Sequence, residues 1–253
     1  MDAWAIGTIV FVCVFGGALL GMYLRSALPQ AHLGEDSKDA VKLGMGLVAT
    51  MSALVLGLLV ATAKGSYDDQ KRGLDQISAD LVLLDGALAQ YGPEAQVARL
   101  QLHHLVTVAV KRLWPEDASQ DATVAPTSLA EGKSIHGLLL ELSPSNDRQR
   151  ALQSMALQIS VEVGKARWLL VAQAESNAIP TPFIVILIFW LAVLFVSFGL
   201  FAPPNATVVA TLFLSALSVS GAVFLIMELA QPFDGLVRIS SAPLRTALAH
   251  LAQ

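Results

Sequence analysis

The chain has 253 residues, of which 55% are hydrophobic and 14% are charged, and its formal net charge is -4. Soluble domains contain about 25% charged residues, so this composition argues against an ordinary soluble domain and is typical of a membrane protein. The lack of a strongly basic run argues against a nucleic-acid partner, and the single cysteine, Cys13, cannot form a disulfide within the chain.

Three stretches contain no Asp, Glu, Lys or Arg: Ala3 to Leu24, Leu43 to Ala63 and Ser176 to Met227. The third is 52 residues long and contains the turn-forming sequence Ala-Pro-Pro-Asn at 202–205. A helix needs about 20 apolar residues to cross the hydrocarbon of a bilayer. The first two stretches therefore predict one transmembrane helix each, and the third predicts two.

The expected fold class is an all-α membrane protein with four transmembrane helices and a helical cytoplasmic domain between spans two and three. We expect transmembrane helices one and two in 1–63, the cytoplasmic domain in 64–175 and helices three and four in 176–230. A C-terminal motif and an amphipathic helix follow in 231–253. The first span is expected to be retained, because its leader lacks Lys and Arg and its apolar core is longer than that of a signal peptide.

The orientation follows from the basic residues that lie near the spans. Seven lie on the side of the middle domain and both termini: Lys64, Lys71, Arg72, Lys165, Arg167, Arg238 and Arg245. Three lie on the other side: Arg25, Lys38 and Lys42. The positive-inside rule then places the middle domain and both termini in the cytoplasm.

The middle domain is expected to be helical throughout. Its first helix carries apolar residues at alternating spacings of three and four, a pattern that predicts packing against other helices. These residues are Leu74, Ile77, Leu81, Leu84 and Leu88. A second helix is expected from about 94 to 114, with Val97, Leu100 and Val108 on one face. Ser128 and Glu131 predict the cap of a short helix, and a long helix is expected from about 145 onwards.

Small residues recur every four positions on the second span, at Ala49, Ala53, Gly57 and Ala61, and on the first span at Gly17 and Gly21. Such faces let helix backbones approach closely in a membrane. They predict either ordinary helix packing or contacts between subunits. On the other side of the second span is an apolar stripe, formed by Leu47, Met51, Leu54 and Leu58. This stripe either faces lipid or forms a hydrophobic constriction in an oligomeric pore.

The fourth span carries a hydroxyl stripe, formed by Thr207, Thr211, Ser215 and Ser218. These hydroxyls are expected to bond to their own helix or a partner helix, or alternatively to line a polar pathway. Glu228, at the end of the span, is interpreted as an interface anchor, with a functional intramembrane acid as the alternative. The sequence contains no pattern that predicts a catalytic group, a metal site or a cofactor site, so no enzyme activity is expected.

The C-terminal run Glu228 to Arg245 contains a Pro-Phe-x-Gly motif, formed by Pro232, Phe233 and Gly235, and then a Ser-x-Pro-Leu turn at Pro243. This run and the four-span layout resemble the bestrophin-like domain family of bacterial membrane proteins, over nearly the whole chain. The resemblance implies a multi-pass protein of the bacterial inner membrane. It also implies a homo-oligomer, pentameric by analogy with bestrophins, whose second spans line an apolar neck for inorganic anions.

The leading interpretation is an oligomeric inner-membrane ion channel, or a channel-like protein, with the second span lining a hydrophobic neck. Its partners are then the lipid bilayer, further copies of the chain and inorganic ions. The alternative is a non-conducting scaffold or sensor that binds a partner through its cytoplasmic helices. A third interpretation compares the layout with the stators of ion-driven motors, in which a hydroxyl stripe could follow the ion path.

Overall fold

A computed structural model of the chain describes residues 3–29, 35–115, 134–176, 181–233 and 235–251, and in these residues the chain forms helices and no strand. Its contacts divide it into two units, which we describe separately. The membrane unit comprises Met1–Tyr67 and Asn177–Arg238, and the second unit comprises Asp68–Ser176 and Ile239–Gln253. Four of the helices in these described residues are long and apolar enough to cross a membrane, which confirms the predicted all-α class with four apolar helices.

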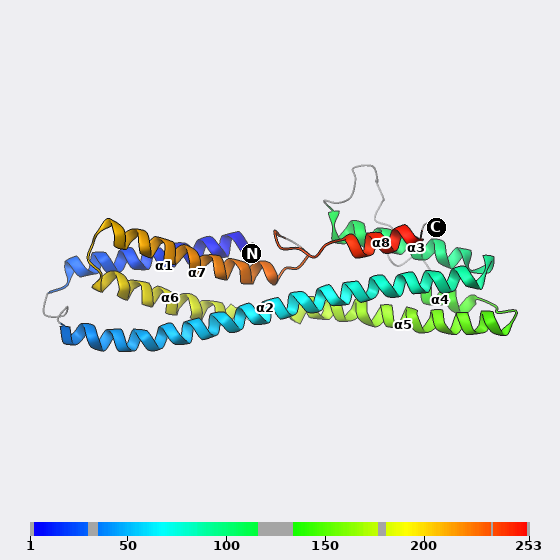
Figure 1. Cartoon of the computed structure of the whole chain (residues 1–253), viewed down its shortest axis with the longest axis horizontal. Coiled ribbons are helices and arrows are strands. Elements are labelled where there is room, and N and C mark those ends of the chain that lie inside the picture. Colours follow the sequence, from blue (N-terminus) through cyan, green and yellow to red (C-terminus); the bar gives the residue numbers. More distant parts are fainter. Residues whose placement is uncertain (1–2, 30–34, 116–133, 177–180, 234, 252–253) are drawn as a thin grey trace. The chain divides into compact units, whose positions relative to one another are not determined.

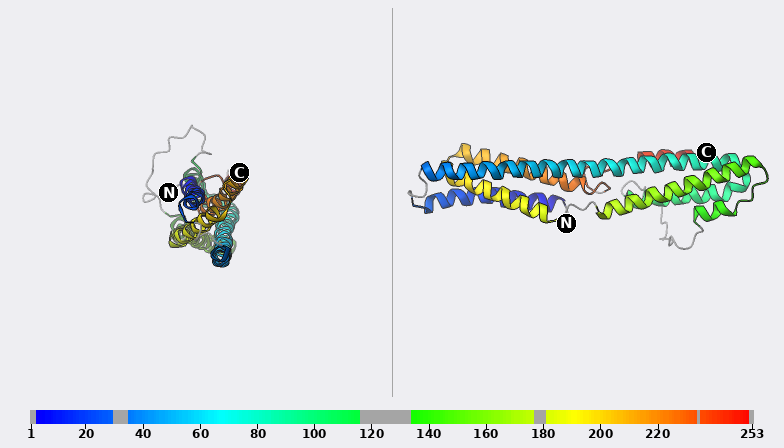
Figure 2. Two further views of the ribbon diagram at one scale, coloured as in Figure 1. Left: turned by 90° about the vertical axis from the view of Figure 1, so that its left-hand side faces the viewer. Right: turned by 90° about the horizontal axis from the view of Figure 1, so that it is seen from below.

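The membrane unit contains α1 (Ala3–Ala27), the first part of α2 (Glu35–Tyr91), α6 (Thr181–Phe201) and α7 (Ala206–Leu229). Figures 1 and 2 show α1, α6 and α7 as a bundle with this part of α2 along its edge. The turn between α6 and α7 forms where the sequence predicts it. Asn205 caps α7 there, because its side-chain oxygen accepts a hydrogen bond from the Val208 amide at 2.8 Å.

The core of the membrane unit forms where α1 packs against α6 and α7. Val10, Val14 and Ala18 of α1 are completely buried. The backbones of α1 and α6 approach each other closely at Gly21 of α1 and Gly199 of α6. A Cβ atom at Gly21 would overlap the carbonyl oxygen of Val196, and one at Gly199 would overlap the carbonyl oxygen of Ala18. The two glycines therefore allow α1 and α6 to pack backbone against backbone.

The second unit contains the rest of α2, a 3₁₀ turn at Pro93–Ala95, α3 (Gln96–Leu113), α4 (Ile135–Glu141), α5 (Asp147–Ser176) and α8 (Ala242–Leu251). The predicted apolar seam of α2 is confirmed. Four of its five members are buried and Ile77 is half-buried. Helix α2 ends at Tyr91, and the next residue, Gly92, has a φ of 122°. Only glycine adopts this conformation at low cost, so the chain turns here.

A bidentate ion pair joins α2 to α3. The Arg99 guanidinium donates to both carboxylate oxygens of Asp85, at 2.7 and 2.9 Å, and both side chains are largely buried. The hydrogen bond to Asp85 raises the pKa of Arg99. The guanidinium and carboxylate match in shape and charge, which fixes α3 against α2 at this point.

The predicted apolar face of α3 is not the face that the fold buries, although its third member, Val108, is half-buried. Val97 and Leu100 are exposed, whereas the buried face is formed by Ala98, Leu102, Val106 and Val110. Both sets recur at helical spacings. The buried positions are four residues apart, close to one helical turn, and α3 packs against α4 and α8. The expected cap at Ser128 and Glu131 lies outside the described residues.

The glycine contact between α1 and α6 predicts the effect of a single methyl group. Gly199→Ala should lower the free energy of unfolding by about 2 kcal/mol, because the new Cβ forces the two backbones apart. The measurement is the thermal unfolding midpoint of the full-length protein in detergent. Gly221→Ala in α7 is the matched control, since nothing lies within 4 Å of its added Cβ. Equal midpoints for the two variants would contradict this account of the packing.

Candidate functional site

The transmembrane stretch of α2 is the least covered of the four. Only 6% of its apolar window is buried within the chain, against 28%, 28% and 22% for α1, α6 and α7. Its buried face is narrow and includes Ser52, Leu59 and Ala63. Because most of an apolar helix surface is left without protein contacts, we take this surface as the candidate functional site.

The apolar stripe of α2 lies on this uncovered surface. Leu47, Met51, Leu54 and Leu58 are between 49% and 71% exposed. At about 100° per residue, they lie on the side of the helix that faces away from Ser52, Leu59 and Ala63. The stripe therefore points away from the chain's own bundle, towards lipid or towards further copies of the chain.

The small residues of the two spans occupy different environments. Gly17 and Gly21 of α1 are buried and pack against α6. Ala53, Gly57 and Ala61 of α2 are exposed, and nothing lies within 4 Å of a Cβ atom placed at Gly57. Ala49, the first member of the set on α2, is half-buried. The small residues of α2 are thus largely unused for packing within one chain.

The hydroxyl stripe of α7 is also exposed. The Thr211 hydroxyl donates to the carbonyl of Thr207 at 2.9 Å, and the Ser218 hydroxyl donates to the carbonyl of Leu214 at the same distance. These two hydroxyls are therefore satisfied by their own helix. All four residues of the hydroxyl stripe lie on one exposed side of α7, away from the buried positions Leu212 and Ala216.

The C-terminal motif begins with a buried carboxylate. Glu228 is only 3% exposed and accepts hydrogen bonds from the amides of Leu236 at 2.7 Å and Val237 at 3.3 Å. Gly235 has a φ of 88°, and a Cβ there would overlap a carboxylate oxygen of Glu228. Glu228 therefore turns back to hold the chain after α7. Its expected role as an interface anchor, and the alternative of a functional intramembrane acid, stay predictions.

The remaining residues of the C-terminal motif lie in two places. Pro232 and Phe233 belong to the turn after α7, and Pro243 belongs to the second unit. Pro232 is buried and Phe233 is half-buried. Pro243 lies in the first turn of α8, whose buried residues are Leu244, Ala247 and Leu251. Within the second unit, the indole of Trp114 donates to the carbonyl of Ile239 at 2.9 Å. This bond and the contact between α8 and α3 attach the C-terminal segment to the second unit.

In the part of the chain that the structure describes, no group of three or more His, Cys, Asp or Glu residues is placed so that it could hold a metal ion. His136 instead pairs with the Ser160 hydroxyl, with 2.8 Å between Nδ1 and Oγ. This contact joins α4 to α5.

Comparison with known proteins gives one match. The family model of the Bestrophin-like domain matches residues 12–244, which is nearly the whole chain. No curated protein and no solved structure matches. The match and the four apolar helices together fit a multi-pass, channel-like membrane protein.

The turn closed by Glu228 predicts how the C-terminal segment responds to mutation. Glu228→Ala should lower the free energy of unfolding by about 2 kcal/mol, since two amides lose their acceptor. Glu228→Gln should keep most of the wild-type stability, because its side-chain amide oxygen can still accept hydrogen bonds from the two backbone amides. Limited trypsin digestion reports on the turn, with faster cleavage after Arg238 expected in the alanine variant. Cleavage at the wild-type rate in that variant would show that the carboxylate does not hold the turn.

Proposed function

The chain belongs to the bestrophin-like domain family, and we propose that it forms an oligomeric ion channel of the bacterial inner membrane, with copies of α2 around a central axis. The observation that carries the proposal is the uncovered apolar surface of α2. The second unit and both termini are cytoplasmic in this proposal, as the distribution of Lys and Arg favours.

The two surfaces of α2 suit the two contacts that such a ring requires. A helix in the ring must touch the α2 of a neighbouring copy and must also face the axis. Gly57 and Ala61 allow the close approach of a neighbouring backbone, as small residues do between membrane helices. Leu54 and Leu58, turned away from the chain's own bundle, then face the axis.

An axis lined by these side chains would be a hydrophobic neck. No Asp, Glu, Lys or Arg lies between Leu43 and Ala63, so this neck carries no charge of its own. An apolar constriction controls conduction by excluding water when it is narrow. Inorganic anions are the proposed ions, by analogy with the bestrophins, and the ring is a pentamer by the same analogy.

The second unit supports contact between copies as well. Several of its large apolar side chains are exposed in the single chain, among them Leu83, Leu100, Trp168 and Leu169. Apolar side chains that together form a continuous exposed patch mark a surface that another protein covers. The same observation favours the alternative function, a non-conducting scaffold or sensor that binds a different protein through this unit.

A current measurement separates the two functions. Purified full-length protein in a planar bilayer should conduct, and Leu54→Ser should raise the conductance by about tenfold, because a hydroxyl keeps the neck wet. Leu217→Ser in α7 is the matched control, since Leu217 is also exposed but lies on another helix. The oligomeric state is measured on the same samples by native mass spectrometry. Intact oligomers that carry no current in any variant, or a monomer that recovers another protein, would favour the scaffold.

A further inference from the structure

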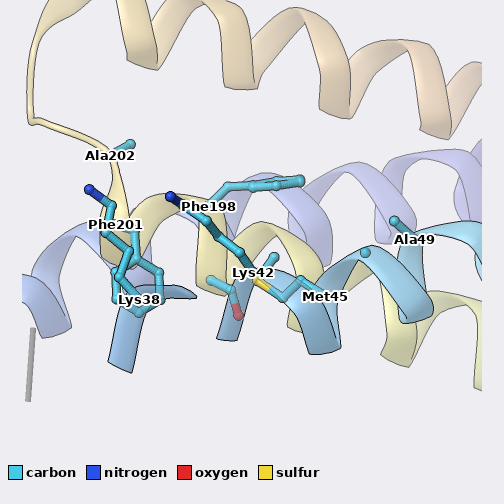
Figure 3. A pocket seen from close by; sticks show the side chains of 9 residues that line it. Lys38, Lys42, Met45, Ala49, Phe198, Phe201 and Ala202 are labelled. Atoms are coloured by element: carbon cyan, nitrogen blue, oxygen red, sulfur yellow. The ribbon is translucent and has the colours of Figure 1, made fainter. Parts of the chain in front are cut away.

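A pocket of about 410 Å³ lies in the membrane unit between the beginning of α2 and the end of α6. Its apolar lining includes Met45, Ala49 and Phe198, and two lysines, Lys38 and Lys42, lie at the same pocket. Figure 3 shows both lysine side chains extending from α2 towards the end of α6, beside Phe198 and Phe201. We call this site the interfacial pocket.

A third cation lies beside the interfacial pocket. Arg25 of α1 donates a hydrogen bond to the carbonyl of Ala202, which lines the pocket. The Lys42 ammonium lies 3.2 Å from the Asp39 carboxylate, but these side chains are 60% and 68% exposed. Water screens an exposed ion pair of this kind, so the Lys42 ammonium can still bind a second anion. Positive groups from two helices thus converge at the end of a third.

The interfacial pocket lies at the ends of two predicted spans. The uncharged stretch of α2 begins at Leu43, directly after Lys42, and α6 ends at Phe201. The lysines are therefore at the level of the lipid headgroups, whereas Met45, Ala49 and Phe198 lie within the apolar stretches. One side of the pocket is positive and the other is apolar, which is the complement of an amphiphile with a negative head.

We infer that the interfacial pocket binds an anionic phospholipid, whose phosphate contacts Lys38 and Lys42 and whose acyl chain lies along Phe198 and Met45. Basic pockets between transmembrane helices are suited to lipid phosphates, and each lysine adds to the attraction. A free phosphate ion would use the lysines but would gain nothing from the apolar lining. The continuity of charged and apolar surfaces in one pocket therefore favours the lipid.

This site is separate from the uncovered face of α2, since it needs neither an oligomer nor a conducting state. Lipid binding and conduction can each fail while the other is observed. A lipid here would hold the beginning of α2 against the end of α6, at the edge where α2 has few contacts with its own bundle.

The test compares lipids bound to the full-length protein by native mass spectrometry after removal of endogenous lipid. Wild type should retain phosphatidylglycerol over phosphatidylcholine with the same acyl chains, and K38Q/K42Q should bind phosphatidylglycerol about tenfold more weakly. K71Q/K165Q is the matched control, because it removes two exposed lysines of the second unit and the same total charge. This control should bind as wild type does.

A further variant and a further ligand complete the test. Ala49→Phe keeps both lysines but fills the apolar part of the pocket, so it should also weaken phosphatidylglycerol binding. Inorganic phosphate should not raise the thermal midpoint of wild type as phosphatidylglycerol does. Three results would overturn the inference: equal binding by K38Q/K42Q and wild type, equal retention of phosphatidylcholine, or full stabilisation by phosphate alone, which would instead assign the site to a free anion.

Discussion

Hydrocarbon supplies neither charge stabilisation nor hydrogen-bond partners, and this constraint governs the membrane unit. It favours spans that are continuous helices with no charged side chain in their central part. It also removes the hydrophobic drive that buries apolar helices in water, so helix association depends on close packing instead. The contact of α1 with α6 at Gly21 and Gly199 meets that requirement. The transmembrane part of α2 has little buried surface, and hydrocarbon tolerates this exposed apolar helix without such close packing.

This solvent also explains why the apolar face of α2 is informative. In a soluble protein, exposed leucines in this number would cause aggregation. In a membrane they are tolerated, so their exposure alone does not identify a contact surface. What distinguishes α2 is the combination of an apolar stripe with Gly57 and Ala61, which are also uncovered. Family membership and this combination are the two observations that support the proposed shared axis.

The elements that depend on local sequence were predictable. The spans follow from the absence of charge, and the seam of α2 from Leu74 to Leu88 follows from its spacing. The buried face of α3 was not predictable. Val97 and Leu100 are more hydrophobic than Ala98 but are exposed, because the neighbouring helices decide which side of α3 is covered. The hydrogen bonds of Glu228 join residues eight and nine positions apart, across a turn that helical periodicity does not describe.

The candidate site shows the same limit. Gly17 and Gly21 have the same four-residue spacing as Ala53, Gly57 and Ala61, so the sequence cannot separate them. The structure does, because α6 covers the first set and no part of the described chain covers Gly57. Small-residue spacing therefore predicts that a helix can be approached closely, whereas the identity of the approaching helix depends on residues far away in the chain.

The close packing of α1 and α6 at Gly21 and Gly199 has a consequence for the divergence of such chains. Each position is closed to larger residues by the main chain of the opposite helix, which no side-chain rearrangement can move. A compensating substitution at one site cannot rescue a change at the other. Both glycines should therefore persist together in any descendant that keeps this helix pair, while the surrounding aliphatic residues drift.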